Sequence, residues 1–185
     1  MLQLHFINSK ISLAIVIFMM VVADIIVEKY FYITNNISAS EPVGKYLIFP
    51  YPIRRGQLRV ICLSSKHKPY MDIMSKIGLQ KDSNSLCNNS YTPLMKQIIG
   101  VPGDEVSITS RGVMINGILI PETIPFNRIG GINLQPILTG YKRILLKDEY
   151  WVRGIGNRSY DSRYFGVIFN NEIGGNSLYL GKLNE

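Results

Sequence analysis

The stretch that decides the fold runs from Leu94 to Ile120 and reads LMKQIIGVPGDEVSITSRGVMINGILI. Apolar runs at 94–99, 105–109, 112–115 and 118–120 alternate with turn signals, first Pro-Gly-Asp and then Asn116-Gly117. Asparagine and glycine tolerate the positive φ angles that both positions of a type I′ hairpin need. This stretch therefore predicts short strands that follow one another through tight turns.

The rest of the chain carries the same kind of pattern. Further strands are expected at 46–49, 57–63, 149–153 and 164–169, whereas 64–92 reads as an irregular excursion and 121–143 as loop-rich. Amphipathic helical periodicity is almost absent, which favours a mainly β domain, a sheet or a barrel. A length of 185 residues with 46% hydrophobic residues suits one packed domain plus a short appendage.

The appendage is the N-terminal segment. The run 11–27 contains Asp24 as its only charged residue and is about as long as the shortest membrane-spanning helices. Lys10 precedes it, which favours a cytoplasmic N-terminus and an exported remainder. The alternative is a signal peptide cleaved after Ala23, with Val21 at the minus-three position. We expect residues 1–29 to form a membrane anchor or signal segment, with the anchor favoured, and residues 30–185 to form the functional domain.

Composition excludes several classes of function. The net charge of +7 is spread along the chain without a Lys/Arg block, which disfavours nucleic-acid binding. The charge fits ordinary solubility, and attraction to anionic lipid is a second use for it. An HExxH motif and zinc-ligand spacings are absent from the sequence, so no metal or other cofactor is expected.

Export would place the two cysteines in an oxidising compartment. An even number of cysteines in an oxidising compartment favours one disulfide, here between Cys62 and Cys87. His67 lies in a polar Ser-Ser-Lys-His-Lys stretch and is expected to be a solvated loop residue.

Three separate segments carry residues suited to chemistry. The first, residues 36–46, reads NISASEPVGKY and holds Ser40 just before a stretch constrained by proline and glycine. The second places Lys96 in an otherwise apolar strand, where desolvation would lower its pKa. The third, residues 154–166, reads GIGNRSYDSRYFG and offers Ser159 beside a potential ion pair of Asp161 with Arg163.

Together these segments resemble the boxes of the type I signal peptidase family, whose members use a Ser–Lys dyad on a β-rich fold outside the membrane. The first segment is most similar to the TraF-type conjugal-transfer branch, whose nucleophile box reads roughly Asn-x-Ser/Thr-x-Ser-x-Pro-x-Gly-x-Tyr. General signal peptidases have Met after the serine, where this chain has Glu41. The stretch around Gly154 is one residue shorter than the usual Gly-Asp-Asn-Arg version.

The resemblance implies a role for each matching residue. Ser40 would be the nucleophile and Lys96 the general base, while the Ser38 hydroxyl and the Ser40 amide would form the oxyanion hole. Ser159 would orient the lysine, and Asp161 with Arg163 would support the site.

The function that the resemblance implies is serine endopeptidase activity at the bacterial inner membrane, with the catalytic domain in the periplasm. The substrate would be a conjugative pilin, cleaved and in some relatives cyclised, or another exported protein. A general signal peptidase and a non-catalytic pilus-assembly component are the alternatives. A cytoplasmic self-cleaving repressor also uses a Ser–Lys pair, but the apolar N-terminus and the lack of a DNA-binding segment argue against it.

Overall fold

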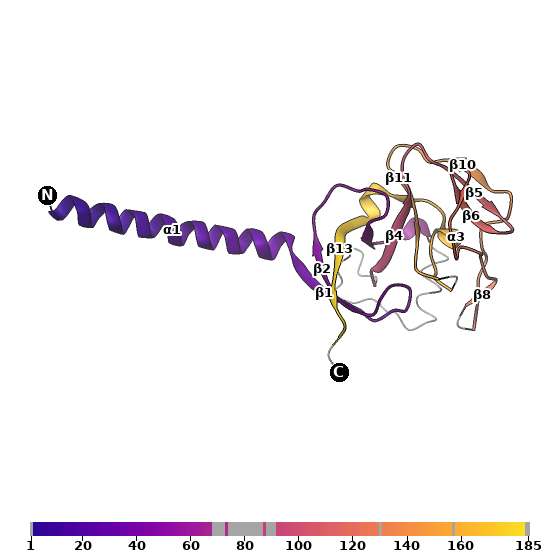
Figure 1. Cartoon of the computed structure of the whole chain (residues 1–185), viewed down its shortest axis with the longest axis horizontal. Coiled ribbons are helices and arrows are strands. Elements are labelled where there is room, and N and C mark those ends of the chain that lie inside the picture. Colours follow the sequence, from indigo (N-terminus) through magenta and orange to yellow (C-terminus); the bar gives the residue numbers. More distant parts are fainter. Residues whose placement is uncertain are drawn as a thin grey trace.

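A computed structural model describes residues 2–67, 73, 87, 92–129, 131–156 and 158–183. The long helix α1, Leu2–Tyr30, projects away from a β domain (Figure 1). Within the described part of the chain, no helix has the combined length and apolarity that crossing a membrane requires.

The largest sheet that the described residues form has seven strands in the order β1-β2-β13-β3-β4-β11-β12. Its strands are, in chain order, β1 Tyr32–Asn36, β2 Gly44–Phe49, β3 Leu58–Ile61, β4 Leu94–Gly100, β11 Glu149–Arg153, β12 Ile168–Phe169 and β13 Ile173–Gly181. Every pair in this sheet is antiparallel. The expected mainly β fold is therefore confirmed.

A smaller sheet of the order β10-β5-β6-β7 packs beside the large one. It consists of β5 Glu105–Thr109, β6 Gly112–Ile115, β7 Ile118–Leu119 and β10 Lys142–Ile144. The hairpin expected at Asn116-Gly117 is present, and both residues have positive φ, at 50° and 79°. A short pair, β8 Arg128–Ile129 and β9 Ile132–Asn133, lies in the stretch that we expected to be loop-rich.

Two of the three apolar cores that the described residues form meet at the strands β4 and β11. Ile98 and Val152 belong to one core, whereas the next residue of β4, Ile99, and Trp151 of β11 belong to the other. Because alternate residues of a strand face opposite sides, both strands are covered on both faces. A lysine in the middle of β4 is therefore surrounded by protein.

At the C-terminal end, one expected strand is only partly present and another strand was not expected. The strand expected at 164–169 is a short helix, α3 Ser162–Phe165, followed by β12. The Asp161 side chain accepts a hydrogen bond from the Arg163 amide and caps the helix. The long strand β13, which no pattern indicated, lies between β2 and β3 and completes the sheet.

His67 is buried, and the expectation of a solvated loop residue is wrong. The short helix η1, Ser65–His67, brings its ring within 3.3 Å of the Glu172 carboxylate in η2, Asn170–Glu172. Glu172 lies 105 residues further along the chain, so the polar residues next to His67 in the sequence could not indicate that the ring is buried. The remainder of the excursion at 64–92, apart from residues 73, 87 and 92, lies outside the described residues.

A disulfide joins Cys62 and Cys87. Cys62 directly follows β3, so the bridge links Cys87 to the end of that strand of the large sheet.

Candidate active site

Ser40 lies in the loop between β1 and β2, and a single side chain shapes that loop. Asn36 Nδ2 donates to the carbonyl oxygens of Ser38, Glu41 and Pro42 at 3.0–3.1 Å. Asn36 Oδ1 accepts from the Ser38 amide at 3.1 Å. An amide side chain has both donors and an acceptor, so asparagine can bond both ends of the turn.

The end of the same motif fixes the loop to the sheet. Tyr46 Oη donates to the Pro42 carbonyl at 2.7 Å, and its buried ring packs against Tyr179 of β13. Gly44 is required by close packing, because a Cβ there would lie 2.3 Å from the Gly181 carbonyl oxygen. Asn36, Gly44 and Tyr46 of the motif thus each make a contact that holds the loop of Ser40 in place.

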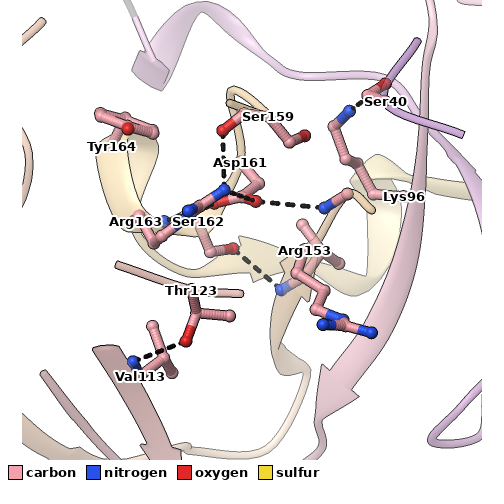
Figure 2. A network of polar contacts seen from close by, with 12 residues as sticks. Ser40, Lys96, Val113, Thr123, Arg153, Ser159, Asp161, Ser162, Arg163 and Tyr164 are labelled. Carbon is pink, nitrogen blue, oxygen red and sulfur yellow. Dashed lines mark hydrogen bonds and ion pairs between the residues drawn. The ribbon is translucent and has the colours of Figure 1, made fainter. Parts of the chain in front are cut away.

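Lys96 projects from β4 toward this loop. Its Nζ donates to Ser40 Oγ at 2.8 Å, as Figure 2 shows. Only 2% of the lysine is exposed. Burial lowers the pKa of Lys96 to about 8, although the carboxylates of Asp161 and Glu41 act to raise it. Lys96 therefore does not lie on a solvated face of β4.

The two residues expected at the oxyanion hole lie side by side. Ser38 Oγ is 2.7 Å from Ser40 Oγ, and the Ser40 amide donates to Ser38 Oγ at 3.4 Å. Ser38 is exposed and Ser40 half-buried, so an approaching carbonyl can reach both. Their role as oxyanion donors stays a prediction.

Asp161 and Arg163 form a fully buried ion pair with two parallel hydrogen bonds. Arg163 Nε and Nη2 each donate to one carboxylate oxygen of Asp161 at 2.8 Å. Arg163 also donates to the carbonyls of Ser159 and Ile124, which ties α3 to two loops. Such forked pairs fix both distance and orientation.

The ion pair reaches Ser40 through the backbone. Asp161 Oδ2 accepts from the Gly154 amide at 3.1 Å, and the next amide, Ile155, donates to the Ser40 carbonyl at 2.7 Å. A Cβ on Gly154 would lie 2.0 Å from Ser159 Oγ and 3.0 Å from the Ser40 carbonyl oxygen. Gly154 is therefore the close-approach glycine of this box, an assignment that the shortened motif left open.

Ser159 is buried in the same cluster (Figure 2). Among the described residues its Oγ makes no hydrogen bond, so its expected contact with the lysine stays a prediction.

One residue of the site was not foreseen. Glu41 follows the serine directly, and only 6% of it is exposed. Burial raises the pKa of Glu41 to about 7, with Lys96 and the Ile155 amide acting to lower it. The sequence showed only that this position departs from the usual methionine.

A serine hydroxyl and a buried lysine are thus in contact, and the Ser38 hydroxyl and the Ser40 amide lie beside the serine. Residues 6–180 match the family model described as signal peptidase, peptidase S26. The chain belongs to that family. The resemblance expected from the three motifs is confirmed.

Individual relatives point to two branches. The plasmid transfer protein TraF of Escherichia coli is 27% identical over 145 residues, covering 75% of this chain and 76% of that protein. The probable conjugal transfer protein TraF of Sinorhizobium fredii is 30% identical over 137 residues, covering 72% and 68%. The probable signal peptidase I-2 of Synechocystis is 32% identical over 85 residues, but covers only 43% and 34%.

Among solved structures, a signal peptidase I from Enterococcus faecalis is similar. It has 18% sequence identity and a TM-score of 0.36, and the match covers 69% of this chain and 97% of the other.

Proposed function

We propose that this chain is a membrane-attached serine endopeptidase that uses a Ser40–Lys96 dyad to mature a pilin subunit for conjugation. The contact of 2.8 Å between a buried lysine and the serine hydroxyl carries the proposal. The substrate class rests on the TraF relatives and on the Asn-to-Tyr motif around Ser40.

The dyad needs no third residue to accept a proton. When Lys96 Nζ loses one proton, the same contact lets the Ser40 hydroxyl donate to Nζ. With a pKa of about 8, roughly a tenth of the lysine is neutral at pH 7. Ser40 Oγ then attacks the scissile carbonyl while its proton passes to Nζ.

The oxyanion would be stabilised by the Ser40 amide and the Ser38 hydroxyl, which lie beside each other next to Ser40 Oγ. The departing amine takes the proton from Lys96, which leaves an acyl-enzyme on Ser40. Water then gives a linear product, and the substrate's own N-terminal amine would give a cyclic one.

Membrane attachment is supported by the side chains of α1. Its described apolar residues between Leu13 and Val27 are mostly exposed, at 37% to 68% for the large ones. The helix projects from the domain, and nothing in the described chain covers these residues (Figure 1). A helix that is apolar on all sides fits hydrocarbon better than water. We place the domain on the periplasmic side of the inner membrane.

The test replaces Ser40 by Ala and, separately, Lys96 by Met. Processing of the pilin precursor, followed by mass spectrometry, should fall by about 10⁴-fold or more in each variant. The exposed residues Ser110 and Lys142 serve as matched controls, changed to Ala and Met.

Normal processing in either dyad variant would contradict the proposal and favour a non-catalytic assembly role. The mass of the wild-type product decides the acceptor, because a cyclic pilin is one water lighter than the linear form. Cleavage of general leader peptides but not of pilin would favour the general signal peptidase alternative.

A further inference from the structure

A cavity of about 530 Å³ lies where α1 joins the β domain, away from the dyad. Lys29 and Tyr30 at the end of α1 form part of its wall, and Tyr51 and Tyr150 contribute from the domain. Neither Ser40 nor Lys96 lines it. The proposed catalysis therefore leaves this cavity without a use.

Arg59 of β3 lines the cavity, and only 1% of it is exposed. Its Nη1 and Nη2 donate to the carbonyls of Gly174 and Tyr51, at 3.3 Å and 2.6 Å. Both carbonyls belong to residues that line the same cavity. Nε is buried and has no hydrogen-bond partner among the described residues. The guanidinium is thus held in place but incompletely satisfied.

Among the described residues, the charge of Arg59 also lacks a counter-ion. No carboxylate of the described residues forms an ion pair with it, and the described lining of the cavity contains no Asp or Glu. The strand register places Arg59 directly opposite Lys96, which is also a buried cation. Burial lowers the pKa of Lys96, and the carboxylates of Asp161 and Glu41 act electrostatically to raise it. Burial lowers the pKa of Arg59. A buried cation of this kind is costly unless an anion comes close to it.

We propose that this cavity binds the phosphate group of an anionic phospholipid, with Arg59 and Lys29 supplying the positive charge. Guanidinium groups suit the oxygens of phosphate, and tyrosines are enriched where proteins meet the lipid–water interface. The position fits this ligand, because the exposed apolar helix ends at Tyr30, beside the cavity. The lipid source rests on the proposed membrane attachment and is independent of the dyad.

The test uses the full chain in mixed micelles of a non-ionic detergent with phosphatidylglycerol or phosphatidylcholine, and native mass spectrometry counts the retained lipids. Wild type should retain one phosphatidylglycerol and bind it at least about 10-fold more tightly than phosphatidylcholine, which has no net charge. Arg59→Met should reduce this retention about 10-fold or more. Arg111→Met, at an exposed arginine in the β5–β6 turn, should leave it unchanged.

A second variant guards against misfolding. Lys29 is exposed, so Lys29→Gln should fold normally and still weaken phosphatidylglycerol retention. Ser40→Ala should bind lipid as wild type does, so failure of the dyad and failure of this site are distinguishable. Equal retention of the two lipids, or retention unaffected in folded Arg59→Met, would overturn the proposal. Displacement of the lipid by inorganic phosphate at millimolar concentration would support the phosphate site and assign it to free phosphate.

Discussion

At the scale of single residues, Glu41 shows how a site can be adjusted beside its reacting groups. Its buried carboxyl lies next to the serine in sequence and acts electrostatically on Lys96. When Glu41 is ionised, it stabilises the charged form of the lysine and so keeps the lysine pKa from falling further. The residue therefore contributes, after burial and Asp161, to the pH at which the proposed base becomes neutral.

We predict that Glu41→Gln shifts the activity profile to lower pH. Wild-type kcat/KM should rise with pH through about 8, because the proposed base must be neutral. Removing the carboxylate removes an interaction that raises the lysine pKa, so the rise should begin at lower pH. The measurement is kcat/KM on a pilin-derived peptide across the neutral range. A midpoint that stays put or moves upward would show that Glu41 does not act on the dyad.

At the scale of elements, the third motif, residues 154–166, positions the backbone around Ser40 and takes no part in the proposed reaction. The Asp161–Arg163 pair caps α3 and binds the Gly154 amide, and the adjoining amide of Ile155 holds the Ser40 carbonyl. Three segments that are distant in sequence are thereby fixed around one serine. This explains why the box carries a buried ion pair in a protein whose proposed chemistry requires only serine and lysine.

We predict that Asp161→Asn costs about 3–5 kcal/mol of unfolding free energy, because it leaves Arg163 buried without a counter-ion. Urea unfolding in detergent, followed by fluorescence of the single tryptophan, Trp151, measures this. Asp148→Asn is the matched control: the residue is exposed and has a φ of 66°, which asparagine tolerates. A loss below about 1 kcal/mol in Asp161→Asn would mean that water reaches the pair.

At the scale of the whole molecule, β4 and β11 separate two of the three apolar cores in the described part of the chain, one on each face, and Met95 of β4 belongs to the third. The dyad lies where the β1–β2 loop meets β4. The helix α1 leads away from the β domain (Figure 1). The disulfide adds a further link, since it joins Cys62, directly after β3, to Cys87, which lies 25 residues further along the chain.

We predict that the double variant Cys62→Ala with Cys87→Ala loses about 3 kcal/mol of stability, from the loop-closure entropy regained by the unfolded chain. Wild type in dithiothreitol should unfold at the same denaturant concentration as this variant, whereas oxidised wild type should resist more. Identical midpoints for oxidised and reduced wild type would contradict a stabilising role.

Much of the architecture could be predicted because it is local. The strands around Glu105–Ile115 and at Glu149–Arg153 have the expected bounds, since turn residues terminate them. The short helix α3 was missed because its cap depends on a side chain that is also part of a buried ion pair. The strand β13 was missed because its glycines, Gly174 and Gly175, disguise a strand that packs closely on β2 and β3.

The sequence by itself determined the residue types and spacings of the site, which identified Ser40, Lys96 and the third motif. Those patterns are readable because each reflects contacts within a few residues, as with Asn36 and its loop. Only the tertiary structure decided that Lys96 is buried against the serine and that Glu41 is a buried carboxyl beside it. It also showed that Arg59 forms no ion pair with a carboxylate in the described part of the chain. Burial and charge pairing depend on segments that meet only in the folded chain, so no local pattern contains them.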